Sequence, residues 1–214
     1  MPTRMRSLND LPPLWILRHG ETTWNVENRL QGRLDSPLTN RGEQQAEQQR
    51  EILRRAELPA DTGFLVSPSG RAVRTAEIIA AHDIWRFETD ERLTEVRLGE
   101  WQGKTVNEIA AGNEDIDMLS DRNLWKFTGP GCETLDDMVD RASDFLNDLT
   151  VPSVIVTHGI TSRVLRCLAL GKPVYELSKL PGGQGVVHYL SGGSAQVLRL
   201  DQHEPQNNKT NRAE

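Results

Sequence analysis

The chain has 214 residues, of which 36% are hydrophobic and 26% are charged. These shares are typical of a soluble globular protein and exclude both a disordered chain and an integral membrane protein. The formal net charge of −6 argues against a general binder of nucleic acid or of anionic membranes, although it leaves the charge of a local pocket open.

The cysteines and the N-terminal residues give no sign of a disulfide framework, a metal site or export. Neither Cys132 nor Cys167 lies near a second Cys or His at the spacing of zinc ligands, so we interpret both as plain buried thiols. The apolar run Leu14–Leu17 is shorter than a signal peptide or a membrane helix requires. We therefore expect a cytoplasmic protein without a metal.

The ends of the chain differ in composition from its middle. Residues 1–12 are predicted to form a flexible leader, ended by a pair of prolines, and the polar residues 202–214 a disordered tail. No repeat or low-complexity linker divides the segment between them. We therefore predict one domain over residues 13–201.

The first half of this domain predicts two short strands and two helices. In chain order they are a strand at Leu14–Leu17, a helix from Thr39 to about Ala56, a strand at Gly63–Val66 and a helix over 70–81.

The second half holds the clearest helix, over 134–149, where apolar residues recur at helical spacing and Thr134 with Asp137 resembles a capping pair. The run Ser153–Thr157 is rich in β-branched residues and predicts a strand buried on both faces, followed by a helix to about Leu170. A closing hairpin is predicted from Gly185–Leu190 and Ala195–Leu200.

Strands that alternate with helices predict an α/β layer fold with a mainly parallel sheet. In such sheets, ligands bind at the carboxyl ends of the strands. Two histidine-glycine pairs, His19-Gly20 and His158-Gly159, directly follow predicted strands although they lie far apart in the sequence. This placement is the first indication of function.

An isolated Arg18-His19-Gly20 would be interpreted as the end of a strand and nothing more. Other motifs change that interpretation because they follow in a fixed order along the predicted domain. They are Arg18–Asn25, Leu30–Gly32 with Asp35–Thr39, Ser67–Ala76, Glu95–Gly103, Gly131–Thr134 and Thr157–Arg163.

This ordered set resembles the histidine phosphatase superfamily, whose fold is phosphoglycerate-mutase-like. The resemblance implies a three-layer α/β/α domain in which His19 is the nucleophile and Glu95 donates a proton to the leaving oxygen. Arg18, Arg71 and His158 would surround the phosphoryl group. The implied phosphate-binding residues are Arg18, Thr22, Asn25, Gln31, Gly32, Arg71, His158 and Gly159.

The chemistry of phosphoryl transfer independently needs these residue types. An imidazole attacks phosphorus only when it is neutral, and nearby arginines oppose its protonation. Arginine forks match phosphate oxygens and stabilise the charge of the transferring group. For Glu95, a structural salt bridge with Arg92 or Arg97 is the alternative.

Two further residues are left without a certain role. Arg74 stands where the family pattern has glutamine, and we expect it in solvent. His188 lies in a predicted strand after the glycine-rich segment 181–185 and could approach the site, although a place outside the phosphate cluster is favoured.

The residues after Glu95 separate the branches of the family. Mutases typically continue with Arg, His and Tyr and carry a downstream Arg-Arg pair that holds a second acidic group of the substrate. Here Val96, Arg97 and Leu98 follow, and no adjacent Arg pair occurs between Trp101 and Thr157. The segment Gly99–Gly103 resembles the phosphatase branch instead.

We therefore predict a cofactor-independent phosphomonoesterase that works through a phosphohistidine. A phosphoglycerate mutase-type transferase and a non-catalytic phosphate-recognising protein are the alternatives. The expected partner is a small-molecule phosphate ester, with no nucleic acid and no membrane. The sequence names neither the ester nor the oligomeric state.

Overall fold

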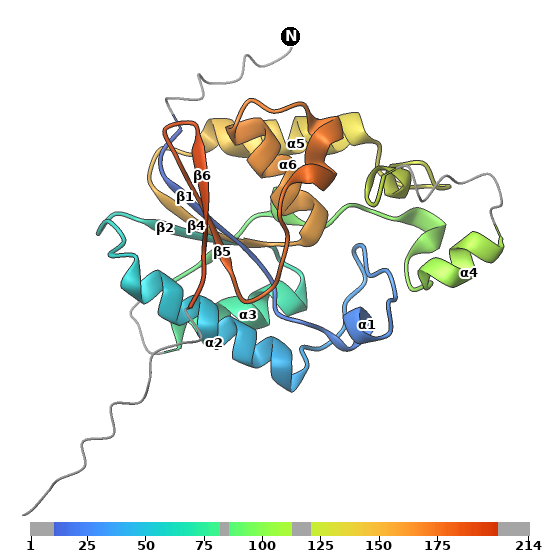
Figure 1. Cartoon of the computed structure of the whole chain (residues 1–214), viewed down its shortest axis with the longest axis horizontal. Coiled ribbons are helices and arrows are strands. Elements are labelled where there is room, and N and C mark those ends of the chain that lie inside the picture. Colours follow the sequence, from blue (N-terminus) through green and yellow to red (C-terminus); the bar gives the residue numbers. More distant parts are fainter. Residues whose placement is uncertain (1–10, 82–85, 113–120, 201–214) are drawn as a thin grey trace, which may run out of the picture.

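The computed structural model describes residues 11–81, 86–112 and 121–200. Within them, six strands form one mixed sheet in the order β3-β2-β4-β1-β5-β6, and helices cover both of its faces (Figure 1). The strands are β1 (Leu14–Arg18), β2 (Gly63–Val66), β3 (Glu88–Thr89), β4 (Ser153–Thr157), β5 (Val187–Ser191) and β6 (Ser194–Leu198). The α-helices are α1 (Thr23–Val26), α2 (Asn40–Arg55), α3 (Gly70–Ala80), α4 (Val106–Ala111), α5 (Leu135–Asp148) and α6 (Gly159–Ala169).

The sheet is mainly parallel. Strands β3, β2, β4 and β1 run in one direction, while β5 is antiparallel to β1 and β6 to β5. This arrangement confirms the predicted three-layer α/β/α fold.

Alternate residues of β1 enter two separate hydrophobic cores. Leu14 and Ile16 pack with residues of α5 and α6, whereas Trp15 and Leu17 pack with residues of α2 and α3. All four are at most 4% exposed, and burying a side chain of this size stabilises the fold by roughly 1.5–3 kcal/mol. The sheet is therefore fixed from both sides, which holds the ends of its strands in place.

The predicted helices begin where the sequence places their caps. The Thr134 hydroxyl accepts a hydrogen bond from the backbone of Asp137, and the Asp137 side chain bonds back to Thr134, which forms the predicted capping box of α5. At the start of α2, the Thr39 hydroxyl accepts a hydrogen bond from the backbone N–H of Gly42 over 3.0 Å. The predicted bounds of these helices are confirmed to within one or two residues.

The hairpin at the end of the domain is shorter than predicted. Strand β5 begins only at Val187, and Gly192-Gly193, both with positive φ, make a two-residue turn before β6. The prediction missed β3, α1 and α4, since segments of two to six residues are too short to show a periodic pattern.

The predicted leader and tail lie largely outside the described residues. Leu11, which the prediction assigned to the leader, packs against the hydrophobic core. No helix of the described residues is long and apolar enough to span a bilayer.

The register of β1 against β4 builds the site. Arg18 pairs with Thr157, and the backbone N–H of His19 donates to the Thr157 carbonyl over 3.0 Å. His19 and His158 therefore leave the sheet at the same edge, and their ring centroids are 5.2 Å apart.

Candidate active site

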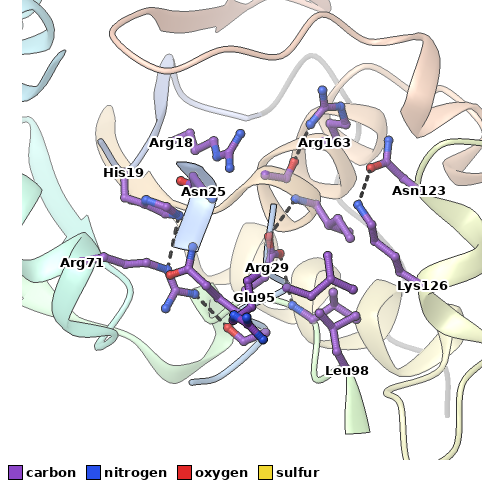
Figure 2. A pocket seen from close by; sticks show the side chains of 16 residues that line it. Arg18, His19, Asn25, Arg29, Arg71, Glu95, Leu98, Asn123, Lys126 and Arg163 are labelled. Carbon is purple, nitrogen blue, oxygen red and sulfur yellow. Dashed lines mark hydrogen bonds between the residues drawn. The ribbon is translucent and has the colours of Figure 1, made fainter. Parts of the chain in front are cut away.

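A cavity of about 220 Å³ opens at the carboxyl ends of β1 and β4 (Figure 2). Its lining is strongly cationic for a protein of net charge −6. The charged lining residues are Arg18, Arg29, Arg71, Lys126, Arg163 and a single carboxylate, Glu95. Such a cavity attracts a small anion.

His19 lies in this cavity as a neutral base. Its Nδ1 is 2.7 Å from the Gly20 carbonyl oxygen, and its Nε2 is 3.3 Å from Nε of Arg71. Because arginine can only donate, Nε2 accepts and Nδ1 carries the proton. Burial, together with the positive charges of Arg18 and Arg71, holds the pKa of His19 well below its usual value. Nε2 is therefore unprotonated at neutral pH, and its lone pair accepts the hydrogen bond from Arg71.

Glycine at position 20 allows the chain to place His19 there. A Cβ added to Gly20 would lie 2.2 Å from the carbonyl oxygen of Gly42, at the start of α2. The backbone N–H of Gly20 donates to the Thr75 hydroxyl on α3, and Gln49 on α2 donates to the Arg18 carbonyl. Two helices thus clamp the residues on either side of the nucleophile.

Arg71 is anchored from the loop opposite. It lies in the first turn of α3 and is 2% exposed. Its Nη1 donates to the Leu34 carbonyl over 2.7 Å and to Asp35 Oδ1 over 2.9 Å, and Nη2 donates to the Gly32 carbonyl over 2.8 Å. These contacts therefore fix the guanidinium so that its Nε donates a hydrogen bond to His19 Nε2.

His158 is fully buried in the cluster, and Arg18 is half-buried beside it. Burial lowers the pKa of Arg18, and the carboxylate of Glu95 opposes that effect. His158 Nε2 is 2.7 Å from the Ser67 hydroxyl, and burial beside Arg71 and Arg18 holds its pKa well below the usual value. Arg18 Nε and His158 Nδ1 have no hydrogen-bond partner in the described part of the chain. His158 does not itself line the cavity.

Glu95 is held at the N-terminus of α6. Its Oε1 accepts from the backbone and the hydroxyl of Thr161, both over 3.1 Å, and its Oε2 accepts from the backbone of Ile160 over 3.2 Å. Burial alone would raise the pKa of Glu95, but these backbone donors outweigh it and lower the pKa. The free site therefore holds Glu95 as an anion.

The alternative of a structural salt bridge for Glu95 finds no support in these contacts. Arg92 pairs with Asp90 and Asp148 instead. The backbone of Arg97 donates to Glu133.

The predicted neutral ligands divide into two groups. Asn25, Gln31, Gly32 and Gly159 line the cavity. Thr22 is fully buried behind them, and its hydroxyl accepts from the Asn25 backbone and from Gln31 Nε2. The structure therefore places Thr22 as a support for other ligands and not in the cavity wall.

Four polar residues of the cavity were missed by the sequence analysis: Arg29, Asn123, Lys126 and Arg163. Arg163 lies one turn into α6, and its Nη1 donates to the Gly159 carbonyl. Lys126 lies in a 3₁₀ turn, with Nζ 3.2 Å from Asn123 Oδ1, and burial lowers its pKa to about 8. The helical spacing from Gly159 could have identified Arg163, whereas no sequence pattern points to Lys126.

The two uncertain residues lie outside the cavity. Arg74 is half exposed and pairs with Glu43 and Glu77, as expected of a residue in solvent. His188 is buried in β5, with Nδ1 3.2 Å from Nη1 of Arg166. His82 and His203 lie outside the described residues. No group of three His, Cys, Asp or Glu side chains within the described ranges is placed to hold a metal ion.

Comparison with known proteins agrees with this geometry. The family model of the histidine phosphatase superfamily (branch 1) matches residues 14–201. A protein of Escherichia coli named probable phosphoglycerate mutase GpmB is 34% identical over 174 residues, which cover 78% of this chain and 79% of that protein.

Solved structures give the same result. YhfR of Bacillus stearothermophilus is 32% identical with a TM-score of 0.73, over 88% of this chain and 96% of that one. A mycobacterial glucosyl-3-phosphoglycerate phosphatase is 29% identical with a TM-score of 0.70, over the same shares of the two chains. The chain belongs to branch 1 of the histidine phosphatase superfamily.

Proposed function

We propose that the protein hydrolyses a small phosphate monoester through a phosphohistidine at His19. One observation carries the proposal: a buried imidazole, protonated on Nδ1 and unprotonated on Nε2, lies in a cavity lined by arginines, one of which donates to that Nε2. A neutral nucleophile beside fixed cations is what attack on a phosphoryl dianion needs. No resident cofactor is required, because the imidazole itself is the nucleophile.

In the first step, His19 Nε2 forms a bond to phosphorus while the bond to the ester oxygen breaks. Arg18 and Arg71 stabilise the charge on the three phosphoryl oxygens. Glu95 delivers a proton to the departing oxygen, so that the alcohol leaves neutral.

The lowered pKa of Glu95 in the free site sets a condition on this step. An ionised carboxylate has no proton to give, so the proton must be taken up when the substrate binds. A phosphate dianion placed beside Glu95 raises the pKa of that carboxyl by like-charge repulsion. The ester can equally bring the proton by binding as its monoanion.

In the second step, Glu95 is again a carboxylate and accepts a proton from water. The resulting hydroxide attacks phosphorus, the phosphorus–nitrogen bond breaks, and the electron pair returns to His19 Nε2. Inorganic phosphate leaves, Glu95 releases the proton to solvent, and the free enzyme with an ionised Glu95 is restored.

The side of the cavity away from His19 favours an ester with a second acidic group. Figure 2 shows Arg163 and Lys126 across the cavity from His19 and Arg71. Neither makes an ion pair within 4 Å in the described part of the chain, whereas Arg71 is paired with Asp35. A carboxylate or second phosphate on the substrate would meet these two cations. The phosphoglycerate ester after which the mycobacterial phosphatase is named carries such a group.

Because the GpmB relative is named a probable phosphoglycerate mutase, a mutase-type reaction is the alternative. This chain, however, has no adjacent Arg pair between Trp101 and Thr157, the pair that is typical of the mutase branch. Hydrolysis is therefore the reaction that we propose.

A rapid-quench experiment with ³²P-labelled ester tests the proposal. We expect label that is stable in alkali and labile in acid, on the peptide that contains His19, followed by release of inorganic phosphate without an acceptor. His19→Gln should abolish both, and the matched variant His188→Gln should retain both. Label on another residue, or full turnover by His19→Gln, would overturn the mechanism; phosphate appearing only on an acceptor ester would indicate a mutase.

A further inference from the structure

A glycine-rich segment, Pro181–Gly185, passes over the end of β1 before the chain enters β5. Gly183 has φ +131° and Gly185 has φ +73°, conformations that side chains other than glycine rarely adopt. We call this segment the strap.

The strap is packed closely between two helices. A Cβ added to Gly182 would lie 2.2 Å from Nη2 of Arg163 on α6, and one added to Gly185 would lie 2.7 Å from Gln48 Oε1 on α2. Gln49 on α2 donates to the carbonyl of Val186. The position of the one long side chain within the strap, Gln184, is therefore well determined.

Gln184 reaches into the site from outside the cavity wall. Its Nε2 donates to the His19 carbonyl over 3.2 Å and to Asn25 Oδ1 over 3.1 Å. The two protons of this amide nitrogen are thus donated to two oxygens, the backbone carbonyl of the nucleophile His19 and the side-chain oxygen of Asn25.

These contacts decide how Asn25 presents its amide. Asn25 Oδ1 accepts a second hydrogen bond, from the backbone N–H of Thr22 over 3.2 Å. With two donors on its oxygen, the amide has its Nδ2 left for the cavity, which Asn25 lines (Figure 2). The reverse orientation would turn Oδ1 toward the phosphoryl oxygens. Both are hydrogen-bond acceptors, so no hydrogen bond could form between them.

We propose that Gln184 is a positioning residue: it fixes the Asn25 amide so that Nδ2 donates to the phosphoryl group, and it ties the backbone of His19 to the same nitrogen. The inference rests on the proposed function for the identity of the ligand. It adds a residue from a part of the chain that contributes no side chain to the cavity wall.

The test compares two substitutions at position 184 with a matched control. Gln184→Glu keeps the shape but cannot donate when ionised, and Gln184→Leu removes both hydrogen bonds. We expect kcat/KM at pH 7.5 to fall by about 10–100-fold in each, the size of one lost hydrogen bond to a charged group. Gln48→Leu, an exposed glutamine beside the strap, should leave kcat/KM unchanged.

Two readouts separate positioning from a loss of structure. The activity of Gln184→Glu relative to wild type should recover as the pH falls through the pKa of the new carboxyl, since the protonated acid can donate to Asn25; Gln184→Leu should show no such recovery. In an Asn25→Ala background, either substitution should cost less than about 3-fold, because the amide to be oriented is gone.

Binding of inorganic phosphate, measured by calorimetry, keeps this inference apart from the proposed function. Gln184→Leu should bind phosphate more weakly than wild type, and this difference in affinity should disappear in the Asn25→Ala background. That pattern would support positioning even if the protein hydrolysed no ester. Effects of Gln184→Leu and Asn25→Ala that simply add, or wild-type phosphate binding and turnover in both variants at position 184, would overturn it.

Discussion

The two sides of the cavity are built differently. The reacting wall consists of Arg18, His19 and Arg71, and the far wall of Asn123, Lys126 and Arg163. Residues of the reacting wall sit at the end of β1 or in the first turn of α3, and Arg71 is held by three acceptor groups.

Residues of the far wall are held more loosely. In the described part of the chain, the only hydrogen bond that Lys126 donates is to Asn123 Oδ1, and the only one that Arg163 donates is to the Gly159 carbonyl of its own helix. In the proposed reaction, rigid elements fix the groups that meet phosphorus, while long side chains from a 3₁₀ turn and a helix face the remainder of the substrate. We therefore assign the chemistry to the reacting wall and the choice of substrate to the far wall.

The largest expected effect is on the reacting wall. Arg71→Ala should lower kcat/KM by about 10²–10³-fold on every phosphate ester, because phosphoryl charge is then left uncompensated in a buried site. Arg71→Lys should not restore it, since an ammonium cannot keep the fork of contacts to Gly32, Leu34 and Asp35. Steady-state kinetics on two unrelated esters checks this, with Arg74→Ala as the control. An equal loss in Arg74→Ala would contradict the assignment.

Between the walls, the effect of Glu95 should depend on the leaving group. Glu95→Gln should slow formation of the phosphoenzyme by about 10²-fold or more with an alkyl phosphate, whose alkoxide needs a proton. With p-nitrophenyl phosphate the loss should be much smaller, because nitrophenolate leaves unassisted. Single-turnover burst kinetics isolates this step from dephosphorylation. A uniform loss with both esters would give Glu95 a structural role.

On the far wall, a substitution should change the preference between esters more than the rate of phosphoryl transfer. Lys126→Met and Arg163→Met should each lower kcat/KM by about 10-fold for an ester that carries a carboxylate. They should change it little for the matched ester without one. Lys179→Met, an exposed lysine paired with Glu176, is the control. Equal losses on both esters would place these cations in the chemistry instead.

The preference for a second acidic group should also depend on pH. The pKa of Lys126 is about 8, so its positive charge is present below that pH and is lost as the pH rises through it. Since kcat/KM reports the free enzyme, the ratio of kcat/KM for the two matched esters should fall between about pH 7 and 9. A ratio that stays constant over this range would remove Lys126 from substrate selection.

The same contrast explains what the sequence could predict. Strand Ser153–Thr157 and the helix after it have clear patterns, and the parallel register then fixes His158 beside His19. Lys126 carries no such signal, because it lies in a four-residue turn whose position depends on the packing of Trp125 against Trp101. The contacts of Thr22 could not be predicted for a related reason: a motif gives the residue type but not whether its hydroxyl faces the cavity or, as in the structure, Gln31.

A residue outside both walls should affect stability without affecting catalysis. His188 is buried, and burial beside Arg166 lowers its pKa to about 3. Between that value and the unfolded value of about 6.5, only the unfolded chain binds the proton, so the free energy of unfolding falls as the pH drops through this window. At pH 5 the loss from His188 should be about 2 kcal/mol. Urea titrations from pH 4.5 to 7.5 should show a flatter pH dependence for His188→Gln; an unchanged slope would contradict the assignment.

The most direct test concerns which nitrogen of His19 carries the phosphoryl group. The hydrogen bond from Nδ1 to the Gly20 carbonyl leaves Nε2 as the unprotonated nitrogen that can attack. Phosphorus NMR of the phosphoenzyme, trapped in alkali and digested to peptides, distinguishes the two phosphohistidine isomers. We predict the Nε2 isomer on the His19 peptide. The Nδ1 isomer, or a phosphoenzyme without phosphohistidine at position 19, would contradict the account.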